Sequence, residues 1–132
     1  RVLLIGDSIS IGYTLPVREK LKGKANVHRI PQNGGATEVG LEKMKAWLGA
    51  GKWDVIHFNF GLHDAKYNSE TTQRASREQY IENLKTLITQ IKATGAKLVF
   101  ATTTPVPAGT VGRLAGSRRG SLTASRHAMS SP

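Results

Sequence analysis

The feature of this 132-residue chain that most restricts its fold is an almost continuous apolar run at residues 53–60. Val55, Ile56, Phe58 and Phe60 lie on both of the alternating faces of a strand, whereas a strand with one solvated face alternates apolar and polar side chains. Strands that are buried on both faces occur almost only in parallel sheets with helices on each side. The run therefore predicts one strand of an α/β sheet.

Strand-like and helix-like segments alternate along the rest of the chain. Short apolar runs predict three further strands, at residues 2–5, 26–30 and 96–101. Helices are predicted after each of the first three strands, at residues 11–22, 37–48 and 76–94. This alternation predicts a three-layer, flavodoxin-like α/β fold, in which a parallel sheet with right-handed crossovers carries helices on both faces.

Capping residues set the expected starts of two helices. Thr37 is the expected N-cap of the second helix, and Ser76 opens a Ser-Arg-Glu-Gln capping box ahead of the third. Pro16 interrupts the hydrogen-bond ladder of the first helix, which leaves the bounds of that helix open.

The charge balance is strongly basic, with 19 Lys and Arg against 9 Asp and Glu, for a net charge of +10. The basic residues are scattered and form no known nucleic-acid motif, so no nucleic-acid partner is expected. The chain has no cysteine, which excludes disulfides and thiol chemistry. The first apolar run is too short for a signal peptide or a membrane span, so a cytoplasmic location without a membrane partner is expected. No zinc-motif spacing is present, and no metal or cofactor is expected.

Three polar clusters follow the predicted strands or lie in neighbouring loops: residues 6–10, 33–37 and 61–64. Ligands of parallel α/β sheets bind beyond the carboxyl ends of the strands, where such clusters meet. Ser8 would stand at the entrance of a helix, where it can act as a nucleophile whose own N–H helps to hold an oxyanion. The simpler alternative is that Ser8 or Ser10 only caps that helix.

Together the three clusters resemble the SGNH, or GDSL-like, hydrolase family, over roughly residues 1–105. The sequence GDSIS at residues 6–10 resembles the first block of the family, in which Ser8 would be the nucleophile. The sequence NGGAT at residues 33–37 resembles the second block, in which Gly35 would lend a backbone N–H to the oxyanion hole.

The third block departs from the family pattern. The sequence GLHD at residues 61–64 resembles a block that is normally Gly-x-Asn-Asp, so His63 stands where the family has its oxyanion asparagine. An imidazole N–H can also donate to an oxyanion. The resemblance implies a serine ester hydrolase for short acyl, acetyl or aryl esters, with Asp7, Asn33 and Asp64 in supporting roles.

A fourth block, the Asp-x-x-His that supplies the catalytic base and the aspartate that orients it, does not follow. Residues 106–132 form an atypical tail rich in Gly, Ser and Arg without a sustained hydrophobic period, as expected of a C-terminally truncated or frame-shifted domain. His127 alone stands near the expected place, but Ala124 occupies the position of the orienting aspartate. A dyad of Ser8 and His127 is expected to be weaker than a triad. The simpler interpretation of His28 is a strand-face residue, and that of His57 is a satisfied core residue.

The residues also allow two other functions. Residues 6–12 could cradle a phosphate, as in a flavin-type binding module of the same fold, although the Gly-x-Gly-x-x-Gly spacing and the P-loop lysine are missing. The chain could also be a catalytically impaired hydrolase remnant. A missing last helix and strand would uncover apolar surface near residues 80–91 and 96–101, which predicts a homo-oligomer, a dimer or larger.

Overall fold

The sheet of this computed structural model, which describes residues 1–69 and 72–103, consists of parallel strands in the order β2-β1-β3-β4. The described strands are Val2–Ile5 (β1), Val27–Arg29 (β2), Val55–Phe58 (β3) and Lys97–Phe100 (β4). The central pair is in register from Val2 opposite Val55 to Ile5 opposite Phe58. The central position of β3 explains why its sequence is apolar on both faces.

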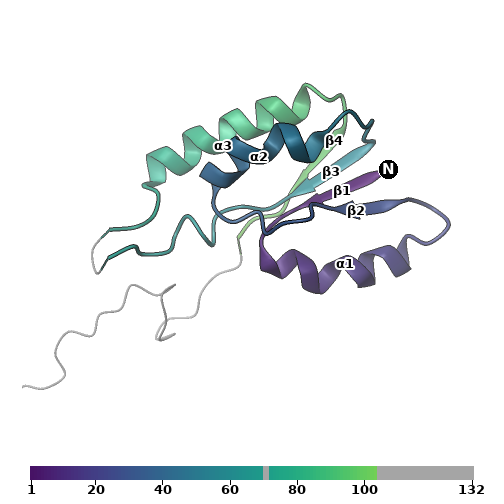
Figure 1. The fold of residues 1–132 in the computed structure, drawn as a ribbon, viewed down its shortest axis with the longest axis horizontal. Coiled ribbons are helices and arrows are strands. Elements are labelled where there is room, and N and C mark those ends of the chain that lie inside the picture. The colour runs from purple at the N-terminus through teal and green to yellow at the C-terminus, as the bar shows by residue number, and fades with distance from the viewer. Residues whose placement is uncertain (70–71, 104–132) are drawn as a thin grey trace, which may run out of the picture.

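The helices lie on both faces of this sheet (Figure 1). They are Ser8–Lys20 (α1), Thr37–Leu48 (α2) and Arg77–Lys92 (α3). α2 and α3 pack side by side over one face, and α1 covers part of the other. The structure therefore confirms the predicted three-layer, flavodoxin-like α/β fold. No helix among the described residues is long and apolar enough to cross a membrane.

The helix starts differ from the predictions at two places. α1 begins at Ser8 rather than residue 11, because Asp7 caps it and accepts a hydrogen bond from the Ile9 N–H at 3.0 Å. α2 has Ala36 at its N-cap, and the expected cap Thr37 is already helical. Ser76 caps α3 as predicted, since its hydroxyl accepts from the Gln79 N–H at 3.1 Å.

The main core lies between the sheet and the pair α2 and α3. Its fully buried side chains come from the sheet layer and from this helix pair: Ile5, Met44, Ile56, Phe58, Phe60, Leu87 and Ile91. At Gly40 of α2, an added Cβ would lie 2.8 Å from the Phe60 ring, so the glycine allows the helix to approach the sheet closely. The expectation that the apolar stripe of α3 lies uncovered is wrong, because Leu87 and Ile91 are buried in this core.

The opposite face carries an apolar groove of about 730 Å³ between α1 and the sheet. Tyr13 and Val17 line it from α1, and His57 and Val99 line it from β3 and β4. Val99 and Phe100 are 40% and 41% exposed, as expected for an incompletely covered edge. The predicted tail, residues 106–132 with His127, lies outside the described residues.

Candidate active site

The candidate nucleophile stands in a tight turn at the carboxyl end of β1, which we call the serine turn (residues 6–10). The Asp7 side chain is almost fully buried and caps α1, so neither Ser8 nor Ser10 is the N-cap. Ser8 is the first helical residue and is exposed. Its backbone N–H belongs to the first turn, where N–H groups lack partners within the helix and favour negative charge.

Ser10 has a structural role in the same turn. Its hydroxyl is buried and donates to the Asp7 carbonyl at 2.6 Å, and it accepts from Arg29 Nε at 2.7 Å. Arg29 Nη1 also donates to the Ile30 carbonyl at 2.8 Å. Arg29 thus fastens the serine turn to the end of β2, a role that the sequence did not reveal. Of the two serines in the motif, only Ser8 presents an exposed hydroxyl.

The loop of residues 33–35 lies directly against the serine turn. The Gly34 N–H donates to the Gly6 carbonyl at 2.9 Å, and an added Cβ at Gly34 would lie 2.8 Å from that carbonyl oxygen. Gly35 has a positive φ of 61°, and its N–H donates to Asn33 Oδ1 at 2.9 Å. The N–H that the resemblance assigns to an oxyanion hole is therefore held by Asn33 in this state.

Asp64 joins the loop after β3 to the start of α2. Its buried carboxylate accepts hydrogen bonds from the Thr37 N–H at 3.0 Å and from the Thr37 hydroxyl. Asn83 of α3 donates to the Thr37 hydroxyl at 2.9 Å. These contacts explain why Thr37 does not cap α2. They hold the second and third clusters in a fixed relation, with Asn83 as a member that sequence reasoning missed.

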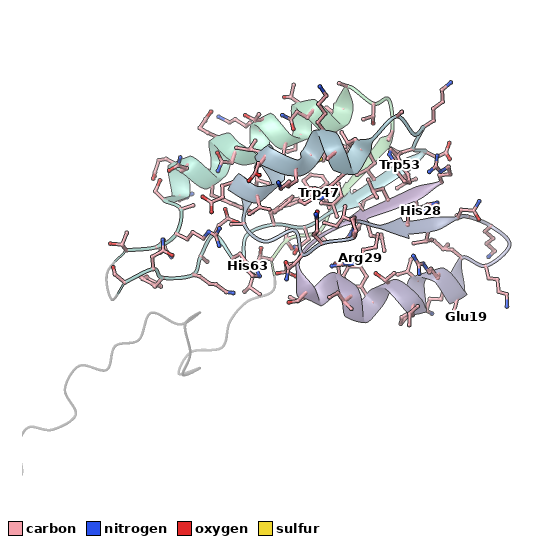
Figure 2. All side chains as sticks on the ribbon, viewed as in Figure 1. Glu19, His28, Arg29, Trp47, Trp53 and His63 are labelled. Atoms are coloured by element: carbon pink, nitrogen blue, oxygen red, sulfur yellow. The ribbon has the colours of Figure 1, made fainter. Side chains whose placement is uncertain are left out.

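His63 lies beside the N-terminal end of α1 (Figure 2). Its Nε2 is 3.7 Å from Asp7 Oδ2, and its Nδ1 is 3.3 Å from Lys66 Nζ. Burial lowers the pKa of His63, the nearby Lys66 ammonium lowers it further, and Asp7 opposes both effects. Neutral imidazole is consequently the favoured form near pH 7.

The other two histidines that the structure describes lie on strands, His57 on β3 and His28 on β2. His57 faces the groove, where its ring centroid is 5.9 Å from that of Tyr13, and burial lowers its pKa. Its Nδ1 is buried without a hydrogen-bond partner in the described part of the chain, so the expectation of a satisfied core histidine is wrong. His28 packs edge-on against Trp53 toward the amino ends of the strands (Figure 2).

The described residues bring part of the predicted site together. The serine turn, the loop of residues 33–35 and His63 meet at one rim, whereas His127 lies outside the described residues. None of the three described histidines forms a hydrogen bond with the Ser8 hydroxyl. Within residues 1–69 and 72–103, no group of three or more His, Asp or Glu side chains is placed to hold a metal ion.

Comparisons with known proteins show a likeness of fold. No family model matches the chain, and no curated protein matches it. A crystal structure of an acetyl xylan esterase, AlAXEase, superposes with a TM-score of 0.65 at 16% sequence identity. The match covers 75% of this chain and 56% of that one, so the chain spans little more than half the length of that esterase. At this identity the likeness concerns the α/β fold.

Proposed function

We propose that this chain is a serine ester hydrolase that acts on short acyl or acetyl esters, with Ser8 as its nucleophile. The observation that carries the proposal is the convergence of three segments on the exposed Ser8 position. Gly34 is hydrogen-bonded to Gly6 at 2.9 Å, and His63 Nε2 lies 3.7 Å from Asp7 Oδ2. A nucleophile needs oxyanion donors from neighbouring segments, and this rim offers backbone N–H groups and an imidazole.

The proposed chemistry proceeds through an acyl-enzyme. The Ser8 hydroxyl oxygen forms a bond to the acyl carbon while a histidine takes its proton, and the ester C–O bond then breaks as the proton passes to the leaving alcohol. A water molecule then attacks the acyl carbon while the same histidine takes its proton. The bond between the acyl group and Ser8 breaks as that proton passes to the Ser8 oxygen. The Ser8 N–H and His63 would donate to the oxyanion, joined by Gly35 once its N–H leaves Asn33 Oδ1. His127 is the proposed base.

A substrate of the acetyl type has independent support from the fold neighbour, which is an acetyl xylan esterase. The phosphate-binding alternative has less support, because the buried Asp7 carboxylate already occupies the N-terminus of α1. A phosphate held by several N–H groups of this turn would have to displace Asp7 from the Ile9 N–H, whereas a single oxyanion needs only the Ser8 N–H.

Covalent labelling with a fluorophosphonate tests the proposal. The wild-type protein should be labelled, Ser8→Ala should not, and Ser69→Ala, which removes another exposed serine, should be labelled like the wild type. Hydrolysis of p-nitrophenyl acetate should follow the same pattern. Undiminished labelling or turnover by Ser8→Ala would place the nucleophile elsewhere. Labelling of Ser8 without turnover would instead identify a catalytically impaired hydrolase.

A further inference from the structure

His63 lies between two groups of opposite charge. The Asp7 carboxylate faces its Nε2 at 3.7 Å, and the Lys66 ammonium faces its Nδ1 at 3.3 Å. Lys66 belongs to the loop that follows β3, three residues beyond His63, and the His63 side chain is 18% exposed. Both ring nitrogens therefore have a defined neighbour, and the two neighbours favour different states of the ring.

The contact with Lys66 distinguishes between the two neutral tautomers. An ammonium group has three N–H donors and no acceptor, so Nδ1 can meet Lys66 only with a lone pair. In a neutral ring, the proton then resides on Nε2. The separation of 3.7 Å from Asp7 is too long for a hydrogen bond, so this Nε2–H has no hydrogen-bond partner on Asp7.

We propose that Lys66 is a positioning residue that holds His63 as a neutral imidazole with its proton on Nε2, and so makes it a fixed hydrogen-bond donor beside Ser8. The assignment of this donor to an oxyanion rests on the proposed esterase function. The tautomer and charge of the ring rest only on the contacts with Lys66 and Asp7.

The charges around the ring come from several elements. Burial of the ring disfavours the imidazolium most, and Lys66 and Arg74 disfavour it further, whereas Asp7 and Asp64 favour it. Removing Lys66 takes away a positive charge that disfavours the imidazolium. Because both carboxylates remain, the pKa of His63 should rise. Removal also frees Nδ1 to carry the proton in the neutral ring.

Either change would weaken the proposed donor. A neutral ring with its proton on Nδ1 would present a lone pair at Nε2, which repels an oxyanion. An imidazolium would be attracted to Asp7 and would turn its Nε2–H toward that carboxylate. Lys66 therefore keeps the ring in the neutral state that can donate from Nε2.

Long-range ¹H–¹⁵N correlation spectra of the histidine rings test the inference directly. His63→Asn identifies the His63 signals, and the spectra are recorded for the wild type, Lys66→Met and the control Lys85→Met, which removes an exposed lysine paired with Glu82 on α3. Above the pKa, the wild type and Lys85→Met should show a protonated Nε2 and an unprotonated Nδ1. Lys66→Met should show a mixture of tautomers and a higher His63 pKa.

A protonated Nδ1 in the wild type would overturn the inference, as would a Lys66→Met protein with an unchanged tautomer and pKa. The hydrolysis assay separates this inference from the proposed function. In an active enzyme, Lys66→Met should lower kcat about tenfold or more with little change in KM, and shift the acid limb of the kcat profile upward. If Ser8 proves inactive, the spectra still decide whether Lys66 sets the state of His63.

Discussion

Gly34→Ala is expected to be among the most destabilising single-methyl additions in this protein. The added Cβ would lie 2.8 Å from the Gly6 carbonyl oxygen and 3.0 Å from its carbon. Both atoms belong to the backbone at the end of β1, so they cannot move aside as the end of a flexible side chain can. Overpacking of this kind costs about 1–3 kcal/mol.

The same substitution also pushes apart the Gly34 N–H and the Gly6 carbonyl, which are hydrogen-bonded at 2.9 Å. Loss of that bond adds about 0.5–1.5 kcal/mol, for a total of about 1.5–4.5 kcal/mol. At about 4–8 °C per kcal/mol for a domain of about 100 residues, Tm should fall by about 6 °C or more. Because the contact joins the serine turn to the neighbouring loop, labelling of Ser8 should also slow under native conditions.

Urea unfolding followed by tryptophan fluorescence measures the effect, since Trp47 is buried in the main core. Gly12→Ala is the matched control. A Cβ at Gly12 meets nothing within 4 Å inside α1, and alanine is the better helix former by about 0.5–1 kcal/mol, so this variant should be stabilised. A Gly34→Ala protein within about 0.5 kcal/mol of the wild type would refute the packing argument.

Further predictions concern the donor, the assembly and pH. His63→Ala should lower kcat about a hundredfold while His63→Asn retains activity, and an Asn variant as inactive as the Ala variant would exclude a donor role. The partly exposed β4 should pair with another copy, so light scattering after size-exclusion chromatography should show a dimer or larger, and a monomer at micromolar concentration would contradict this. Mixing Ser8→Ala with His127→Ala should restore activity if the copies share sites, and mixed oligomers without activity would exclude sharing. The folded-state pKa values of His57 and His63 lie below the unfolded value of 6.5, so their contribution to the unfolding free energy should be complete above 6.5 and decrease as the pH falls through it. His57→Phe should reduce that decrease, and an unchanged slope would refute the assignment.

The sequence by itself determined the layers of the fold and the rim that carries the polar clusters. Local patterns were sufficient here, because the apolar run of β3, the cap at Ser76 and the alternation of strands and helices are readable within a few residues. The parallel sheet follows from that alternation, and the carboxyl ends of its strands must then share one edge. The motif around Ser8 was visible for the same reason.

Only the tertiary structure decided which side chains at that rim touch. Arg29 meets Ser10, and Asp64 meets Thr37, across 19 and 27 residues of sequence, and such pairs depend on the strand order β2-β1-β3-β4 rather than on local pattern. The buried Asp7 is the N-cap of α1, a position that the sequence also allowed for Ser8 or Ser10. The pKa of His63 depends on burial of the ring and on charged neighbours, of which Lys66 lies at 3.3 Å and Asp7 at 3.7 Å. Such effects vary steeply with distance and burial, which no sequence spacing specifies.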